Sequence, residues 1–293
     1  MELQSDLLHL IEVLKTEKTI CLLAPSFPVD FEFPEILGKL KQIGFEKIVE
    51  LTYAAKIINL HYHKLFKEHP ENQYICSNCP TIVKLIEHKY PQHKDKLIDV
   101  ASPMVIMSRF IKKEMGPEYK TVFVGPCLAK KLEARESGNV DYAITFKELQ
   151  AIFDYYKENN LPTKEFNFDV TESGEMDFDK FYNDYTKVYP LSGAVAQTMH
   201  AKDILQENQI LIVDGIAGMD AAIKTFEADT NIKFLDALSC LWGCIWGPGI
   251  ISKESTETKA DKVRNYKEYC KKDKIGKKFG KFEYSEWLHV SRL

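Results

Sequence analysis

Apolar positions along the chain fall either in short continuous runs or at helical spacing. Residues 3–16 place leucine and isoleucine three and four positions apart, which predicts an amphipathic helix. The mostly apolar run 19–24 stops at Pro25, as a buried strand does where it enters a loop. A helix over 34–43 and a strand over 47–51 follow. This order of strand, loop, helix and strand predicts a parallel sheet and an α/β fold.

The same alternation continues to about residue 235. Further helices are expected over 54–67, from Pro80, over 104–115, from 128, and over 146–156, 193–199 and 219–227, and further strands near 74–75, 121–124, 141–144, 209–213 and 232–235. The alternation breaks over 165–184, where seven acidic residues accompany only one lysine. We interpret this segment as a solvated excursion rather than a site.

The charged C-terminal segment 253–281 holds eleven Lys or Arg against five Asp or Glu. Such a run is typical of a solvated helix and tail, and a docking surface for an acidic redox partner is the alternative. We expect no nucleic-acid partner, because no binding motif accompanies the lysines and the whole chain has a net charge of −4.

Length and composition bound the class of protein. The chain has 293 residues, and its hydrophobic content of 45% is ordinary for a globular protein. No apolar run approaches the roughly 18 residues that a membrane span needs, and the N-terminus lacks the pattern of a secretory signal. We therefore expect a cytoplasmic protein with no membrane partner. Cysteines in such a reducing compartment more often bind metal or do chemistry than form disulfides.

Seven cysteines occur, and five of them lie in Gly- or Pro-rich loops after predicted strands: Cys76, Cys79, Cys127, Cys240 and Cys244. Cys21, inside an apolar run, and Cys270, in the lysine-rich segment, are interpreted as structural or incidental. The stretch 238–249 packs two thiols, two tryptophans, three glycines and a proline into twelve residues. Neither a helix nor a strand favours that composition, which points to a bound object.

Four thiolates are what a 4Fe-4S cluster requires, and glycine-rich backbone can donate N–H groups to its sulfurs. Zinc accepts the same four ligands. A structural zinc site usually has two tight cysteine pairs, whereas Cys127 stands alone beside Pro126. Spacing therefore favours iron–sulfur and leaves zinc open.

Three motifs carry a resemblance to a known family. Residues 125–133, Gly-Pro-Cys-Leu-Ala-Lys-Lys-Leu-Glu, resemble the Pro-Cys-x-x-Lys-x-x-Glu motif of FeFe-hydrogenases. Residues 77–80, Ser-Asn-Cys-Pro, resemble their Ser-Cys-Cys-Pro motif, and 238–249 resembles their Cys-x-x-x-Cys motif followed by glycines. Similar short segments lie at 24–26, 44–45, 54–55, 102–103 and 214–216, so the resemblance covers nearly the whole chain.

The resemblance implies an H-cluster domain of two lobes, each with a small, mostly parallel, twisted sheet flanked by helices and with the cluster between the lobes. We place lobe one at about 1–120, lobe two at about 121–250 and a lysine-rich C-terminal extension at 251–293. The implied cofactor is a 4Fe-4S cluster linked through one cysteine to a two-iron subcluster with CO, CN and a dithiolate bridge.

Site residues are carried over by position. Lys130 would give its ammonium to one anionic cyanide, whereas Ser26 and the Pro25 backbone would lie near the other. Pro126 and Gly125 precede the second motif cysteine and would flank the cofactor. Without the motif, Lys130 would be interpreted as an exposed helix lysine. The expected ligands of the cubane, the last of them bridging to the two-iron unit, are Cys79, Cys127, Cys240 and Cys244.

The sequence departs from a hydrogen-producing enzyme at the first proton-carrying group. The family has a cysteine where this chain has Asn78, and an amide is neither acid nor base near neutral pH. The glutamates that continue the relay are missing from the helix that contains His61 and His63. These histidines or Cys76 could substitute, although surface polar residues are the commoner explanation for such histidines.

Two methionines that pack against the cluster in productive members correspond to Gly125 and Leu238. Glycine at 125 should leave space or water beside the two-iron unit. Pro248 interrupts the usual glycine run. These changes resemble the sensory branch of the family.

We therefore expect a sensory or low-activity FeFe-hydrogenase domain that binds H2 and protons and has low turnover if it is active. Its expected partners are an electron-transfer iron–sulfur domain or ferredoxin, and a signalling domain after residue 293. We therefore expect the chain to be an excised module or a minimal member of the family. The alternatives are a non-catalytic module like the hydrogenase-like proteins of iron–sulfur assembly, and a zinc scaffold.

Overall fold

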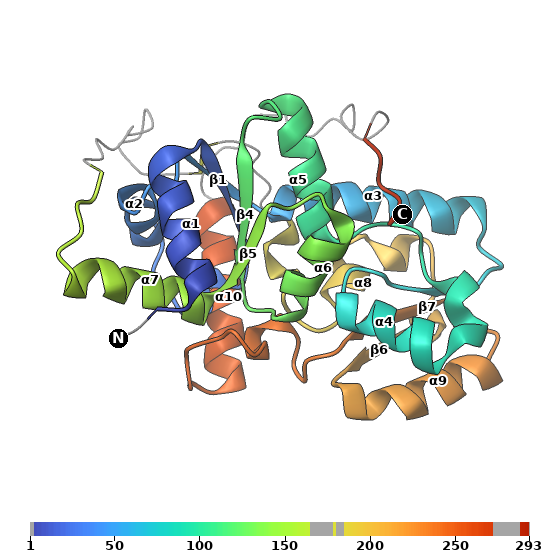
Figure 1. Ribbon diagram of the computed structural model, residues 1–293. Coiled ribbons are helices and arrows are strands. Elements are labelled where there is room, and N and C mark those ends of the chain that lie inside the picture. Colours follow the sequence, from blue (N-terminus) through green and yellow to red (C-terminus); the bar gives the residue numbers. More distant parts are fainter. Residues whose placement is uncertain (1–2, 165–177, 180–184, 272–287, 293) are drawn as a thin grey trace.

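Two small parallel sheets organise the protein (Figure 1). The computed structural model describes residues 3–164, 178–179, 185–271 and 288–292. One sheet has the order β2-β1-β4-β5, with β1 at Thr19–Leu23, β2 at Lys47–Glu50, β4 at Lys120–Gly125 and β5 at Tyr142–Thr145. The other has the order β3-β7-β6, with β3 at Tyr74–Ile75, β6 at Ile210–Asp214 and β7 at Phe234–Leu238. All paired strands are parallel, which confirms the predicted α/β fold.

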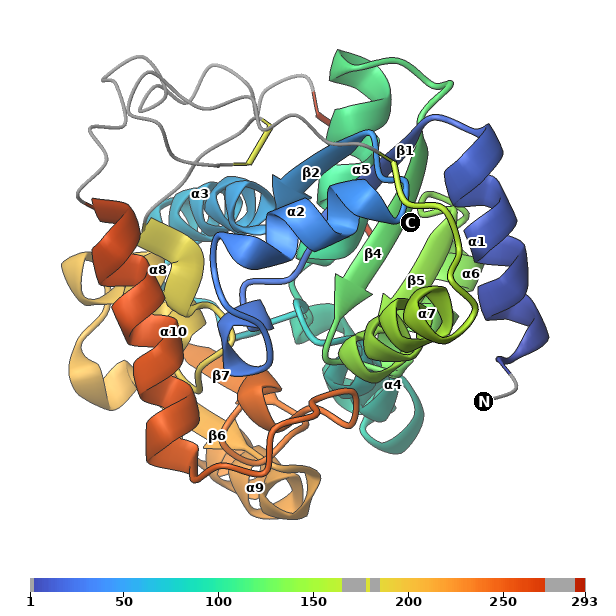
Figure 2. The same cartoon turned by 90° about the vertical axis from the view of Figure 1, so that its left-hand side faces the viewer.

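Helices flank both sheets. They are α1 (Ser5–Thr16), α2 (Glu35–Gln42), α3 (Thr52–Glu68), α4 (Pro80–Lys89), α5 (Pro103–Glu114), α6 (Ala129–Ser137), α7 (Phe146–Glu158), α8 (Ala194–Thr198), α9 (Met219–Ala228) and α10 (Thr256–Lys271). α5 and α7 pack against the four-stranded sheet, and α9 packs against β6. Figure 2 shows α1 and α7 side by side at one edge of the molecule.

Local sequence explains where these elements begin and end. All five residues of β1 are buried, as a continuous apolar run predicts for a central strand, and Pro25 follows in the turn that ends it. Pro80 occupies the first turn of α4, where its missing N–H costs nothing. Thr145 caps α7 through a capping box with Glu148.

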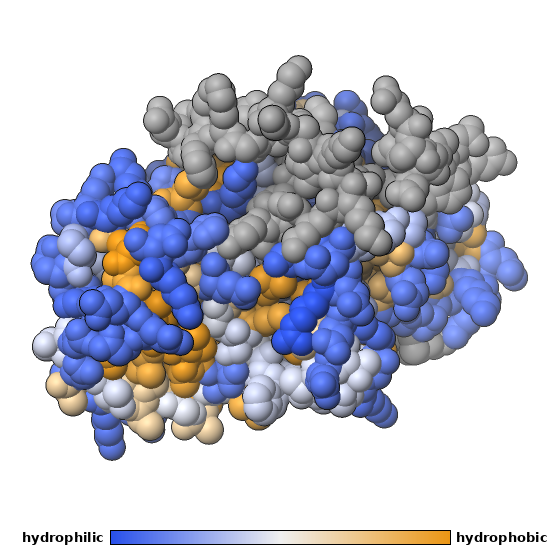
Figure 3. Space-filling model, turned by 180° about the vertical axis from the view of Figure 1, so that it is seen from behind, coloured by the Kyte–Doolittle hydropathy of each residue, from blue (hydrophilic) through white to orange (hydrophobic). Residues whose placement is uncertain are grey.

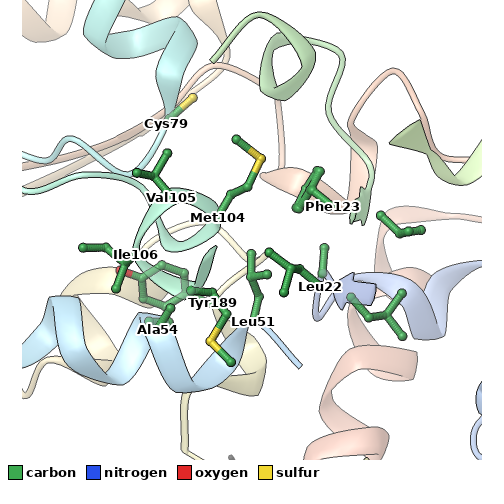
Figure 4. Packing of buried hydrophobic residues seen from close by; sticks show 14 of the residues in the cluster. Leu22, Leu51, Ala54, Cys79, Met104, Val105, Ile106, Phe123 and Tyr189 are labelled. Carbon is green, nitrogen blue, oxygen red and sulfur yellow. The ribbon is translucent and has the colours of Figure 1, made fainter. Parts of the chain in front are cut away.

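The two sheets interleave in sequence instead of dividing the chain at residue 120. β3 (74–75) precedes that point but pairs with β7, and β4 (120–125) follows it but pairs with β1. The chain therefore crosses between the sheets several times. Figure 4 shows part of the interior, where side chains of α3, α5, β1 and β4 pack together and Cys79 lies at the edge of the group.

The lysine-rich helix α10 is not simply solvated. Ala260, Val263 and Tyr266 form a buried stripe along it. The ring of Tyr266 packs 4.9 Å from that of Phe27 and 5.1 Å from that of Phe33. The sequence pattern does not reveal this face, because charged residues outnumber the apolar residues on the helix. The rest of the lysine-rich segment, after residue 271, and most of the acidic segment 165–184 lie outside the described residues.

Parallel strands place their following loops at one edge of each sheet, and in α/β proteins that edge binds ligands. Four such loops matter here: 24–26 after β1, 76–79 after β3, 126–127 after β4 and 239–244 after β7. Within the described ranges, no helix has the length and apolar character needed to cross a membrane.

Candidate metal centre

Residues 238–249, here called the cysteine loop, fold closely onto two other backbone segments. Gly243 has φ +83°, and a Cβ there would lie 2.4 Å from the carbonyl oxygen of Pro190. Cys244 N–H donates to that same oxygen over 2.7 Å. Gly249 N–H donates to the carbonyl oxygen of Pro126 over 2.8 Å. The glycines therefore serve close backbone contact, which a side chain would prevent.

These contacts bring the loop to the cysteines of the other motifs. Cys79, Cys127 and Cys244 line one cavity of about 90 Å³. Its other lining residues are Ala24, Pro25, Ser26, Leu51, Ala55, Asn78, Pro80, Pro103, Phe123, Pro126, Lys130, Tyr189, Pro190 and Leu238. They come from both sheets and the loops after their strands, from the first turns of α3, α4, α5 and α6, and from the segment before α8.

Cys240 does not line this cavity, but it lies within electrostatic range of the other thiols. Burial raises the pKa of its thiol, and the neighbouring thiols of Cys127 and Cys79 raise it further. The Cys79 thiol also donates to the hydroxyl of Ser239, over 3.4 Å. The structure thus gathers the four cysteines that the motifs predict. In the described part of the chain, no three Cys, His, Asp or Glu side chains form a site for a single metal ion.

The surroundings of Cys127, Cys240 and Cys244 favour the protonated form of each thiol, because burial raises its pKa. Burial raises the pKa of Cys127 and of Cys244, while the ammonium of Lys130 acts to lower both. Only thiolates bind iron, so loading of the site must release protons.

Lys130 is not an exposed helix lysine. Its side chain lines the cavity, the residue is 8% exposed, and it follows Cys127 by one helical turn. Its Nζ donates to Glu133 Oε2 over 2.7 Å, so the last two motif residues form an ion pair. A nearly buried ammonium in a largely apolar cavity attracts an anionic ligand.

Three polar atoms at the cavity lack a hydrogen-bond partner among the described residues: Ser26 Oγ, Asn78 Oδ1 and the Tyr189 hydroxyl. A buried polar group without a partner costs about 1–3 kcal/mol. These atoms, the four thiols and Lys130 form a donor set that fits an iron–sulfur cofactor with small polar ligands. Pro25, Pro126 and Leu238 line the same space.

The expectation of empty space at Gly125 is wrong. A Cβ at this position would lie 2.4 Å from Cζ of Phe123 and 2.9 Å from Cβ of Ala24. The Phe123 ring therefore fills the volume that a side chain at 125 would take, and it lines the cavity itself while Gly125 does not. Figure 4 shows Phe123 packed near Met104 and Leu22. The motif alone does not reveal this packing, because Phe123 lies outside the motif. The two residues meet because they lie on the same face of β4.

The suggested substitutes for the proton relay lie away from the cavity. Cys76 Sγ accepts the N–H of Ala237 over 3.1 Å, so this thiol faces β7. His63 Nδ1 lies 3.0 Å from the carbonyl oxygen of Met199. His61 Nε2 is buried without a partner among the described residues. None of the three is a lining residue, whereas Asn78 is.

Sequence reasoning missed Tyr189, Phe123 and Asp236 as residues of this region. Tyr189 lies next to the acidic segment and belongs to no recognised motif. Asp236 carried a signal, because it is an acid in the middle of the apolar run of β7.

The cysteine loop also exposes large apolar side chains. Leu241 and Trp242, between the two cysteines, are 56% and 52% exposed. Ile212, in β6, and Ile216, just after it, are also exposed, and a Cβ at Gly215 would lie 3.4 Å from Cδ1 of Leu241. Figure 3 shows the apolar surface gathered on the side that holds β6 and α9.

Comparison with known sequences shows which protein family has these motifs. The sequence profile of the family "Iron only hydrogenase large subunit, C-terminal domain" matches residues 17–248. The chain is 25% identical over 235 residues to the cytosolic Fe-S cluster assembly factor NAR1 of Encephalitozoon cuniculi, covering 74% of this chain and 63% of that protein. It is 24% identical over 285 residues to iron hydrogenase 1 of Clostridium pasteurianum, covering 78% of this chain and 48% of that protein. The chain thus spans less than two thirds of these relatives.

Solved structures share the fold. A variant of [FeFe]-hydrogenase HydA1 from Chlamydomonas reinhardtii superposes with a TM-score of 0.68 at 13% identity, covering 90% of this chain and 88% of that one. The structure of HydA(deltaEFG), described for stepwise H-cluster assembly, superposes with a TM-score of 0.66 at 14% identity and covers 98% of both chains. Both likenesses confirm the expected fold of small parallel sheets flanked by helices.

Proposed function

Because this chain belongs to the family formed by the C-terminal domain of the iron-only hydrogenase large subunit, we propose that it is a sensory or low-activity FeFe-hydrogenase domain that binds H2 at an H-cluster. The observation that carries the proposal is Lys130, whose nearly buried ammonium lines the cavity of the motif cysteines. Besides its partner Glu133, this ammonium lies where an anionic ligand of the cofactor, such as a cyanide, would bind.

In this proposal Cys79, Cys127, Cys240 and Cys244 would hold the 4Fe-4S cluster, and Cys244 would also be the link to a two-iron subcluster with CO, CN and a dithiolate bridge. The bound cofactor supplies the chemistry of reversible H2 cleavage. Lys130 binds one cyanide, and the unpartnered hydroxyl of Ser26 with the Pro25 backbone binds the other. Pro126 and Leu238 line the surrounding wall, and Gly125 leaves room for the Phe123 ring, which lines it too.

Low turnover follows from Asn78. This residue lines the cavity where a proton donor is needed, and its amide does not titrate near neutral pH. A domain that binds H2 but exchanges protons slowly suits a sensor better than a producer of hydrogen.

The proposed partners are H2, protons and an electron-transfer iron–sulfur domain or ferredoxin, and a signalling domain would read the state of the cluster. The exposed Leu241 and Trp242 support electron transfer through the cysteine loop, since they lie between two cluster ligands. A cytoplasmic location is in line with the name of the cytosolic assembly factor among its relatives.

The test is infrared spectroscopy of protein loaded with the complete cofactor by maturation enzymes or by chemical transfer of the two-iron unit. Bands of CO and CN in a region free of protein absorption are expected for the wild type, shifting when H2 is added. Lys130→Gln should shift the CN bands or lose the two-iron unit, while Lys131→Gln, its neighbour on α6, should not. Absence of these bands in protein that holds four irons per chain contradicts the proposal.

The second candidate is a non-catalytic iron–sulfur module like those of iron–sulfur assembly. It is favoured by Asn78 and by the likeness to the assembly factor NAR1. It predicts four irons per chain, no CO or CN bands after maturation and no H2 turnover, so iron content and infrared spectra together separate the two candidates.

A further inference from the structure

A buried ion pair lies beside the segments that form one side of the cysteine-lined cavity. Lys187 and Glu50 are 4% and 2% exposed, and Lys187 Nζ donates to Glu50 Oε2 over 2.5 Å. Neither residue belongs to a cysteine motif, and neither lines the cavity. Because the desolvation of two charges offsets much of their attraction, so deep a pair is better explained by the geometry that it fixes than by stability.

The pair joins two parts of the chain that reach the cavity. Glu50 is the last residue of β2, and Leu51, which follows it, lines the cavity. Lys187 lies in the short 3₁₀ helix η3 (Tyr185–Val188), and both residues that follow η3, at positions 189–190, line the cavity. The ion pair therefore fixes one wall segment against the other.

The segment after η3 holds the backbone of a proposed cluster ligand. The Pro190 carbonyl oxygen accepts the N–H of Cys244 over 2.7 Å. A second contact ties η3 to the start of α3, because Thr186 Oγ1 donates to the carbonyl oxygen of Thr52 over 2.5 Å. Lys187 lies only three residues before Pro190, so its ion pair bears on the position of that carbonyl oxygen.

The lysine-rich helix α10 supports the same segments from outside. Lys187 Nζ also donates to the hydroxyl of Tyr266 on α10 over 3.1 Å, and it lies 4.5 Å from the centre of that ring. α10 packs against η3 and against η7 (Cys244–Trp246), the 3₁₀ helix that begins at the proposed ligand (Figure 2). The family profile ends before α10, so this contact belongs to a part of the chain that the family match does not cover.

The geometry points to Lys187 as a positioning residue of the candidate centre. Its ammonium ties η3 to Glu50 and to Tyr266 of α10. This tie fixes the Pro190 carbonyl oxygen, which in turn holds the backbone of Cys244. The inference rests on the proposed use of Cys244 as a cluster ligand, which both candidate functions share.

The first experiment measures amide hydrogen exchange in the purified chain and needs no cofactor. In Lys187→Met the exchange rate of the Cys244 amide, relative to the amides of β4, should rise at least tenfold, because its bond to Pro190 opens more often. Lys112→Met is the matched control. It breaks an ion pair of α5 with Asp141, 3.0 Å long, that lies outside the cavity wall, and it should leave this ratio unchanged.

Two further variants separate positioning from the cost of an unpaired charge. Lys187→Met leaves the Glu50 carboxylate buried without its cation, whereas the double variant Glu50→Gln/Lys187→Met leaves no charge and should still show the faster exchange at Cys244. Tyr266→Phe keeps the packed ring and removes only the hydroxyl, so it should stay folded and raise the ratio about threefold. A wild-type ratio in both the double variant and Tyr266→Phe overturns the inference.

The second experiment uses the chain reconstituted with iron and sulfide. At four irons per chain, the g values of the reduced cluster in electron paramagnetic resonance should shift in the double variant and match the wild type in Lys112→Met. Wild-type g values in the double variant count against the positioning role alone. Missing CO and CN bands in matured protein count against the H-cluster proposal alone, because this experiment needs no two-iron unit.

Discussion

Asn78 decides at the scale of a single residue how fast protons can reach the cavity. Its side chain lines the space between the motif cysteines, and the side-chain oxygen Oδ1 is buried with no partner among the described residues. The backbone around it already has the geometry of the motif, because Cys79 follows directly as the N-cap of α4, which begins at Pro80. Replacing this one side chain therefore changes chemistry with little change of structure.

We predict that Asn78→Cys raises H2 turnover of the loaded protein by about a hundredfold, the usual contribution of one positioned acid or base. Asn78→Ser is the matched control, because its hydroxyl has a similar size but does not titrate near neutral pH. Turnover is measured with a reduced electron donor at several pH values. Equal rates for both variants would mean that another step limits the reaction.

Asp236 makes a prediction about stability that needs no cofactor. Its pKa is about 6 in the folded chain against an ordinary 3.8, so the folded state binds more protons than the unfolded state between these values. The free energy of unfolding therefore falls as pH rises, by about 2 kcal/mol between pH 4.5 and 7.5 from this group. Urea unfolding should show that the stability of Asp236→Asn relative to wild type rises by this amount over that interval.

The cysteine loop, at the scale of an element, depends on the absence of side chains. Gly243 has φ +83°, and a Cβ there would lie 2.4 Å from a backbone oxygen. A Cβ at Gly247 would likewise lie 2.5 Å from the carbonyl oxygen of Pro126. Lys259 of α10 supports the loop from outside, with its Nζ 3.2 Å from the centre of the Trp246 ring. The loop is thus fixed by contacts with three distant segments.

We predict that Gly243→Ala destabilises the fold by about 3 kcal/mol or more, because the strain of positive φ adds to a backbone clash. Gly138→Ala is the matched control, since Gly138 has φ +61° but open space around it, and it should cost about 1 kcal/mol. Thermal unfolding and iron content after reconstitution measure both effects. Similar losses in the two variants would show that the loop yields at Pro190.

On the scale of the whole molecule, the candidate centre joins the two sheets. Cys127 follows β4 of the four-stranded sheet, whereas Cys79, Cys240 and Cys244 follow β3 and β7 of the other. A ligand that binds only the folded state stabilises it by mass action, so a cluster held from both sheets should resist their separation.

Reconstitution with iron and sulfide should therefore raise the melting temperature of the wild type by about 5 °C or more. Cys127→Ser should lose most of this rise in melting temperature, because the three remaining ligands all follow strands of the three-stranded sheet. Cys270→Ser, a thiol on α10, should keep it. A full gain in Cys127→Ser would show that the cubane does not use this ligand.

The order of elements could be predicted from the sequence because it depends on local patterns. The apolar run of β1, the helical spacing of α1 and the proline that opens α4 all lie within a few neighbouring residues. The three cysteine motifs were equally local. The buried face of α10 could not be predicted from its highly charged sequence. Only the contacts of Tyr266 with Phe27 and Phe33 show which side of that helix is buried.

The sequence by itself determined the α/β alternation, the motif cysteines, Lys130 and the loss of an acid at position 78, because each is a property of a residue or its neighbours. Tertiary structure decided which strands pair across the midpoint of the chain, how Phe123 fills the space at Gly125, and that Asp236 lies buried beside Cys76 and Ala196. The strand pairs and the contacts of Asp236 with Cys76 and Ala196 join residues far apart in sequence, and even the contact of Phe123 with Gly125 depends on how the strand packs. Their physical cause is close packing and the burial of charge, which no local pattern records.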